Sequence, residues 1–244
     1  MKRLFAALQF LTVLPGVSRI ACTERDLGRS VPFFPVVGLL IGGVLVGVDR
    51  LLGSVLAPLP ATVLIVIAML AVSGGLHADG LADTADGFLS ARPRERILEI
   101  MKDSHIGVMG VIAIVSVFTL KVAALSAVPS PRRWPALLLM PLAGRCALVL
   151  EMGVLPYARP EGGLGSVFVR NRSRFDIFWA LAWLAAAGYV AAGYRGLLAG
   201  AGAVVWTLVF SLWCRRTIGG FTGDTLGAAC EIAELAPALL LGLR

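Results

Sequence analysis

Three aspartates at helical spacing are the residues of this sequence best suited to chemistry. Asp79, Asp83 and Asp86 stand at positions i, i+4 and i+7 of the glycine-bounded segment 74–87, so a helix there carries all three carboxylates on one face. Such like charges repel unless a cation or water separates them. Mg²⁺ takes one or two carboxylates and completes its shell with water and substrate phosphates. The segment therefore predicts a magnesium site for a phosphate-bearing substrate.

His77 lies two residues before the first of these aspartates. It can accept a proton, donate a hydrogen bond to a phosphate, or simply lie at a membrane interface. The plainer interpretation of the whole segment is a polar cap that ends a membrane helix, but such a cap needs one Asp rather than three. We therefore count His77 with Asp79, Asp83 and Asp86 as candidate catalytic residues.

A second segment points to anion binding. Lys102, Asp103 and Ser104 precede Gly107-x-x-Gly110, where another predicted helix begins. Lysine, serine and free backbone N–H groups at a helix N-terminus form an anion site, so we expect these three residues to contact substrate. The charged stretch before them has the apolar stripe of a helix on the membrane surface, and its arginines are expected on the solvated face.

A third segment, 219–227, is also rich in glycine and also opens a predicted helix. Glycines let the backbone approach a phosphate closely, and Asp224 can supply a further metal ligand. Thr222 is predicted to contact substrate. The segment is no P-loop, because the required G-K-[ST] is absent, and its plainer interpretation is a flexible turn capped by Thr or Asp.

The elements that must position these residues lie in a membrane. Of the 244 residues, 58% are hydrophobic and only 15% are charged, which is far more apolar than soluble domains. This composition excludes a disordered chain, a disulfide scaffold and a nucleic-acid-binding module. The four cysteines form no C-x-x-C pair, so neither disulfides nor zinc are predicted.

The hydropathy pattern predicts a polytopic all-α membrane protein of six to seven transmembrane helices, forming one domain over residues 1–244. The first 15 residues are expected to form an interfacial or partly inserted helix. A helix needs about 20 apolar residues to cross the bilayer. Seven segments qualify, namely Phe33–Leu52, Val55–Ser73, Gly107–Val128, Pro135–Leu155, Ile177–Tyr194, Gly196–Trp213 and Thr225–Leu243. The spacing Gly38-x-x-x-Gly42 suits close helix packing.

The distribution of Lys and Arg predicts the orientation. Fifteen of them fall on one side of the predicted spans and five on the other, so the first side is assigned to the cytoplasm of the inner membrane. The segments 74–110, 157–176 and 219–227 all lie on that side. We therefore expect a single active site that faces the cytoplasm.

Charged residues inside predicted spans need partners. Arg145 lies about 15 Å deep, ten residues from the end of its span, and its pairing with Glu231 or Glu234 is the simplest explanation. Contact between Arg145 and substrate is the alternative. Lys121 is expected to extend its ammonium outward to the membrane surface.

Taken together, these motifs resemble cobalamin synthase, the adenosylcobinamide-GDP ribazoletransferase family. The motifs that carry the resemblance follow one another in the family's order and spacing over nearly the whole chain. They are FLTVLP (10–15), FFPVVGLLIG (33–42), GGLHADGLADTADG (74–87), SARPRERILEIMKDSHIGVMG (90–110), YARPEGGLG (157–165) and GGFTGDTLGAA (219–229).

The resemblance implies substrates and roles. The family joins adenosylcobinamide-GDP to α-ribazole or its 5′-phosphate and releases GMP, in a lipid bilayer and without nucleic acid; a homo-oligomer is left open. It implies Mg²⁺ on Asp79, Asp83 and Asp224, with Asp86 as a further ligand or the base. Phosphate contacts are implied for Lys102, Ser104 and Arg159.

Two other classes of protein remain as alternatives. CDP-alcohol phosphotransferases share an Asp-Gly-x-x-Ala core, but the residue after Ala82 is Asp83 rather than the Arg usual in that family. A transporter would use Arg145, Glu231 and Glu234 as its path. Transport would place carboxylates near the membrane midplane, whereas the acidic cluster is predicted near the surface.

Overall fold

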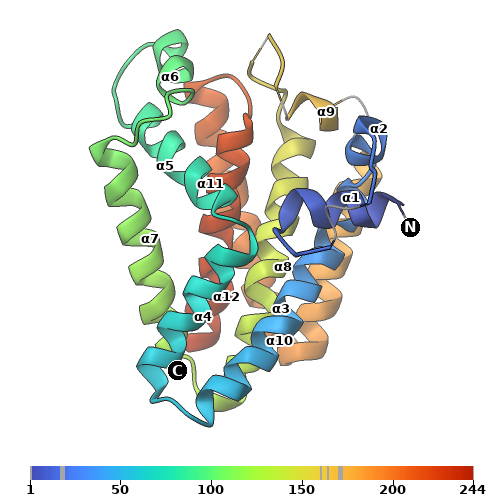
Figure 1. Cartoon of the computed structure of the whole chain (residues 1–244), viewed down its shortest axis with the longest axis vertical. Helices are drawn as coiled ribbons and strands as arrows, with labels where there is room; N and C mark the ends of the chain where they lie inside the picture. Colours follow the sequence, from blue (N-terminus) through green and yellow to red (C-terminus); the bar gives the residue numbers. More distant parts are fainter. Residues whose placement is uncertain (1, 17–19, 160, 164, 170–172, 244) are drawn as a thin grey trace.

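The computed structural model describes residues 2–16, 20–159, 161–163, 165–169 and 173–243. Arg19, Arg170, Arg172 and Arg244, which entered the charge count, lie outside these ranges. The described residues form helices and one isolated backbone bridge, so the predicted all-α fold is confirmed (Figure 1). The elements are α1 (Lys2–Leu11), α2 (Glu24–Gly28), a 3-10 turn (Val31–Phe33), α3 (Phe34–Gly53), α4 (Pro58–Val72), α5 (Leu76–Phe88), α6 (Arg94–Ile100), α7 (Val108–Ala127), α8 (Ser130–Val154), α9 (Ser166–Val169), α10 (Arg174–Thr217), α11 (Gly223–Ala233) and α12 (Leu235–Gly242).

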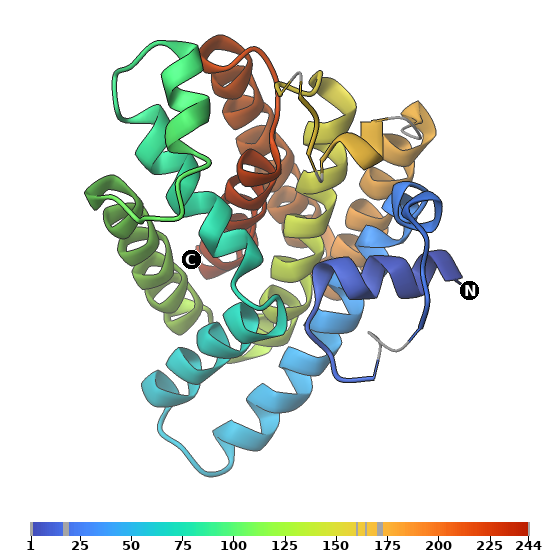
Figure 2. The ribbon, with the colours of Figure 1, turned by 45° about the horizontal axis from the view of Figure 1, so that its top comes forward.

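Helix α8 forms the centre of the bundle. It packs against α3, α10, α11 and α12, and nearly all of its residues from Pro135 to Met152 are buried. The predicted glycine contact is confirmed on α3, where a Cβ on Gly38 would lie 2.7 Å from the Pro141 carbonyl oxygen of α8. Figure 2 shows α1 lying across the bundle beside α3 rather than along it.

Five helices of the described chain are long and apolar enough to cross a membrane, or six if the bent pair α4 and α5 counts as one span. Helix α10 is counted as one of these five, although its backbone leaves helical geometry at Ala192 and Gly193 and so divides it into two helical halves. A Cβ on Gly196 would lie only 1.9 Å from the Gly188 carbonyl oxygen, so the two halves of α10 pack side by side. The prediction of six to seven membrane helices agrees with this arrangement.

Helix α5 does not continue α4. The two helices meet at 88°, because Gly74 and Gly75 both adopt positive φ, at 62° and 78°, a conformation that favours glycine. The predicted acidic helix therefore exists, but as a separate element. Gly74 and Gly75 place it across α11 instead of in line with the preceding span.

Four buried charges join α7, α8 and α11. The Lys121 ammonium donates to both Glu231 and Glu234, and Arg145 donates to Glu234 at 2.6 Å. The expectation that Lys121 reaches outward is wrong, since the residue is 1% exposed. The predicted pairing of Arg145 with a glutamate of the last span is confirmed. Two cations and two anions leave the cluster neutral.

Glycine packing can be tested on neighbouring positions of α3. A Cβ on Gly42 would lie 2.6 Å from the Leu138 carbonyl oxygen, whereas a Cβ on Gly43 meets nothing within 4 Å. We expect Gly42→Ala to lower the free energy of unfolding by about 1–3 kcal/mol. Gly43→Ala should leave it unchanged or raise it by up to about 1 kcal/mol. Thermal unfolding in detergent measures both, and equal effects would contradict the packing described.

The buried charge cluster predicts a second stability difference. Lys121→Met removes the partner of the buried Glu231 and leaves Glu234 with Arg145 alone, so we expect a loss of about 3 kcal/mol or more in the free energy of unfolding. Lys102→Met removes an exposed ion pair with Glu161 and should cost at most about 1 kcal/mol. Adding Glu231→Gln to Lys121→Met should restore part of the loss. A Lys121→Met protein as stable as wild type would show that the cluster holds nothing together.

Candidate active site

Helices α5 and α11 cross at backbone contact distance. A Cβ on Gly80 would lie 2.6 Å from the carbonyl oxygen of Asp224, and a Cβ on Gly227 would lie 2.9 Å from that of His77. Only glycine lets two helices approach so closely. The crossing therefore brings Asp79 and Asp83 of α5 to the first turn of α11, where Asp224 lies.

Asp79 and Asp83 carry no internal partner. Among the described residues, neither carboxylate takes part in a hydrogen bond or an ion pair. Asp83 is half-buried and experiences the negative charges of Asp79, Asp224 and Asp86, together with a weaker attraction from Arg159. Negative charge therefore outweighs positive charge on this face of α5. The sequence analysis predicted such repulsion between its carboxylates.

Asp224 is held by a cation of the protein. Arg159 donates to Asp224 at 2.7 Å, and the Thr222 hydroxyl donates to the same carboxylate at 3.3 Å. The segments that carry Arg159 and Asp224 are joined by backbone hydrogen bonds, from Ala158 N to Phe221 O at 2.8 Å and from Phe221 N to Pro156 O at 2.9 Å. This pairing fixes the position of Arg159 relative to α11.

Asp86 has a different environment from Asp79 and Asp83. Its two oxygens accept hydrogen bonds from the backbone N–H groups of Gly107, at 2.7 Å, and Gly110, at 2.8 Å. A Cβ on either glycine would clash with this carboxylate. The predicted anion site at the start of α7 thus exists, but Asp86 itself occupies the backbone N–H groups. Its predicted part as metal ligand or base stays a prediction.

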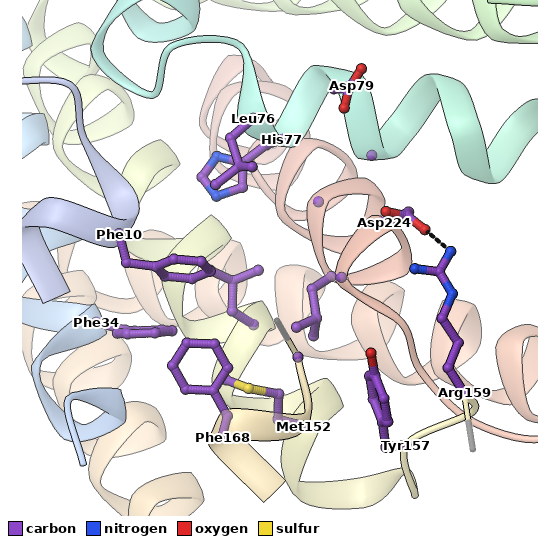
Figure 3. A pocket seen from close by; sticks show the side chains of 16 residues that line it. Phe10, Phe34, Leu76, His77, Asp79, Met152, Tyr157, Arg159, Phe168 and Asp224 are labelled. Atoms are coloured by element: carbon purple, nitrogen blue, oxygen red, sulfur yellow. Dashed lines mark hydrogen bonds and ion pairs between the residues drawn. The ribbon is translucent and has the colours of Figure 1, made fainter. Parts of the chain in front are cut away.

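Two cavities meet at Asp79. The larger, of about 880 Å³, is lined by Asp79, Asp83, Lys102, Asp103 and Ser104 together with apolar residues of α1 and α7. The smaller, of about 150 Å³, is lined by His77, Asp79, Arg159, Asp224 and several aromatic rings (Figure 3). The structure therefore gathers most of the predicted site residues around two adjoining spaces.

The loop residues on the rim of the larger cavity form exposed ion pairs. Lys102 donates to Glu161, and this hydrogen bond holds the pKa of Glu161 below its usual value. Hydrogen bonds from His105 lower the pKa of Asp103 in the same way. Both carboxylates are solvent-exposed, so these pairs contribute little to stability. Lys102 and Ser104 remain accessible to a ligand at this rim.

Two predicted substrate contacts line neither cavity. Thr222 is fully buried and caps α11, accepting a hydrogen bond from the backbone N–H of Thr225; the plainer interpretation as a capped turn describes it better. Arg145 is 2% exposed and occupied by Glu234. Thr222 instead supports the site through its hydrogen bond to Asp224, whereas Arg145 belongs to the buried charge cluster.

Two features of the candidate site were not predicted from the sequence. Arg94, expected on a solvated face, donates to the carbonyl oxygens of Ile218 and Ala158, both at 2.8 Å, and so ties α6 to the paired loops. The aromatic rings of the smaller cavity, Phe10, Phe34, Tyr157 and Phe168, come from separate segments. Three of these rings lie inside the motif segments 10–15, 33–42 and 157–165, but the spacing within each segment does not indicate that the segments converge.

The carboxylates fit a magnesium ion that takes its remaining ligands from water and from substrate phosphate. Among the described residues, no three His, Cys, Asp or Glu side chains converge as a ready metal site. Asp79 and Asp83, one helical turn apart and without partners, offer the one or two carboxylates that Mg²⁺ usually takes before water and phosphate complete its shell. Asp224 lines the same cavity as Asp79 but is engaged by Arg159, so its part as a further metal ligand stays a prediction.

The whole chain matches known proteins. A family model described as cobalamin-5-phosphate synthase matches residues 3–242. The chain is 42% identical to the adenosylcobinamide-GDP ribazoletransferase of Herpetosiphon aurantiacus, over 96% of this chain and 93% of the relative. It is 39% identical to that of Geotalea daltonii, over 95% and 93%, and no solved structure matches. With a family model and relatives that cover nearly its full length, this chain belongs to the cobalamin-5-phosphate synthase family.

Proposed function

We propose that this protein is an Mg²⁺-dependent adenosylcobinamide-GDP ribazoletransferase of the inner membrane. The observation that carries the proposal is a pair of carboxylates that have no partner among the described residues: Asp79, which lines both cavities, and Asp83, which lines the larger one. A reaction between two substrates requires both to bind next to the same catalytic groups, and two adjoining cavities allow this. Family membership supports the identity of the substrates, and the relatives are named for this reaction.

The reaction is a phosphoryl transfer. The 3′-hydroxyl oxygen of α-ribazole, or of its 5′-phosphate, forms a bond to the phosphorus nearest the corrinoid. The bond from that phosphorus to the oxygen of the departing GMP breaks, and the hydroxyl proton passes to a carboxylate of the cluster. Such transfer depends mainly on positioning and on neutralising the charge of the phosphates.

The described side chains divide this work. Asp79 and Asp83 would hold Mg²⁺, which when bound supplies positive charge to the phosphate oxygens. Arg159 places a guanidinium beside Asp224 at the smaller cavity, and Lys102 and Ser104 offer donors at the larger one. Asp86 holds the start of α7 against α5, and thereby keeps Lys102 and Ser104 near the cluster.

Product release tests the proposal directly. With purified protein in detergent, adenosylcobinamide-GDP, α-ribazole 5′-phosphate and Mg²⁺, we expect GMP and an equal amount of the corrinoid phosphodiester. Chelating Mg²⁺ should stop the reaction. Asp79→Asn and Asp83→Asn should each lower kcat at least about 100-fold, without loss of thermal stability, because each removes a repelling charge. Chromatography of GMP and of the corrinoid product measures turnover in each case, and thermal unfolding in detergent measures the stability of the variants.

Asp49→Asn is the matched control. Asp49 lies near the far end of α3 and pairs with Arg133 at 2.8 Å, so this variant should turn over normally. If Asp79→Asn retained full activity, the cation assignment would be overturned. Formation of CMP from CDP-diacylglycerol and an alcohol, with no reaction of the corrinoid pair, would instead identify a lipid phosphotransferase.

The cytoplasmic location of the site can be tested with single cysteines. Cys146, Cys214 and Cys230 are buried, so replacing Cys22 alone gives a quiet background. Ser104→Cys lies exposed at the rim of the larger cavity, and Ser130→Cys lies exposed at the opposite end of α7. An impermeant maleimide should label Ser130→Cys on intact cells and Ser104→Cys only on inside-out vesicles. The reverse pattern would place the site on the outer face.

A further inference from the structure

The smaller cavity is built around aromatic rings; we name it the aromatic chamber. Phe10, Phe34 and Phe168 form a triad whose ring centroids lie 5.1–5.9 Å apart, and Tyr157 stands beyond Met152 toward Arg159 (Figure 3). Phe34 and Phe168 are almost fully buried. The chamber therefore offers flat apolar walls away from bulk water, where aromatic ligands gain most from stacking and edge contacts.

One buried polar side chain reaches this apolar space. His77 is 3% exposed, lines the chamber, and its Nε2 has no hydrogen-bond partner. Figure 3 shows its imidazole projecting from α5 toward Phe10. A buried nitrogen without a partner costs free energy, and a ligand with a complementary polar atom would remove that cost. His77 thus indicates a ligand that is mostly apolar but carries a hydrogen-bonding edge.

The other end of the chamber is charged. Asp79, Arg159 and Asp224 form its mouth, and Asp79 also lines the larger cavity. A molecule with a flat apolar head in the chamber would place its polar remainder beside these carboxylates. There it would face a second substrate held in the larger cavity.

We propose that the aromatic chamber binds the benzimidazole base of the ribazole acceptor, with the ribose directed to Asp79 and Asp224. The inference rests on the proposed function and assigns one substrate to each cavity. A cavity of roughly 150 Å³ accepts a benzene-sized ring, so the chamber admits one ring of the bicyclic base while the other ring lies at the open mouth. The free ring nitrogen of the base accepts a hydrogen bond, which His77 Nε2 can donate.

The alternatives fit less well. The corrinoid is too large for about 150 Å³, so it requires the larger cavity or the open rim. Guanine has several donors and acceptors, and apolar walls with one histidine would leave most of them unpaired. The larger cavity, with Lys102 and Ser104, suits the donor and its pyrophosphate.

Two kinds of variant test the assignment. Phe168→Ala opens the chamber and His77→Phe removes its polar atom, so each should raise KM for α-ribazole 5′-phosphate about tenfold. KM for adenosylcobinamide-GDP should change less than about twofold, because the larger cavity is untouched. His77→Gln, which keeps a donor, should be affected less than His77→Phe. Phe210→Ala, a buried ring of α10 outside both cavities, controls for general loss of packing.

Competition with the base alone separates this inference from the proposed function. Free 5,6-dimethylbenzimidazole should inhibit competitively against α-ribazole 5′-phosphate but not against adenosylcobinamide-GDP. Competition against the donor, or a raised donor KM in Phe168→Ala, would overturn the chamber assignment while GMP release still supported the function. If no GMP forms, calorimetry can still measure the affinity of the free base for wild type and for Phe168→Ala. Equal affinities would contradict base binding in the chamber, whereas a lower affinity in the variant would support the chamber as a base site.

Discussion

The candidate active site depends on the close crossing of α5 and α11. Gly80 and Gly227 remove the side chains that would keep the two backbones apart, and the carboxylates of both helices consequently share one space. Larger residues at either glycine would separate Asp79 and Asp83 from Asp224 by the width of a side chain. The bend at Gly74 and Gly75 serves the same crossing, because a straight continuation of α4 would carry the acidic residues past α11.

Two groups of charged residues lie in different environments. Lys121, Arg145, Glu231 and Glu234 pair with one another within the bundle and join the helices that carry them. Within the part of the chain that the structure describes, Asp79 and Asp83 form no ion pair at the cavities. A surplus of negative charge is costly in the protein alone, and the proposed Mg²⁺ would offset that cost.

The sequence was most informative where chemistry is local. Helical spacing predicted the shared face of Asp79 and Asp83, and hydropathy predicted the membrane helices, because both patterns lie within one segment. It was least informative where distant segments meet. That the anion at the start of α7 is Asp86, and that Arg94 binds the carbonyls of Ile218 and Ala158, are tertiary facts with no periodicity to reveal them. The convergence of Phe10, Phe34 and Phe168 is of the same kind.

The bridge between the loops at Tyr157 and Phe221 has a consequence for how the family can diverge. It is formed by backbone atoms, so the identity of most residues there matters less than their number. Inserting or deleting one residue between Leu155 and Arg159 would shift the register of the bridge and carry the guanidinium of Arg159 away from Asp224. We therefore expect related enzymes to vary in composition along these loops while keeping their lengths constant.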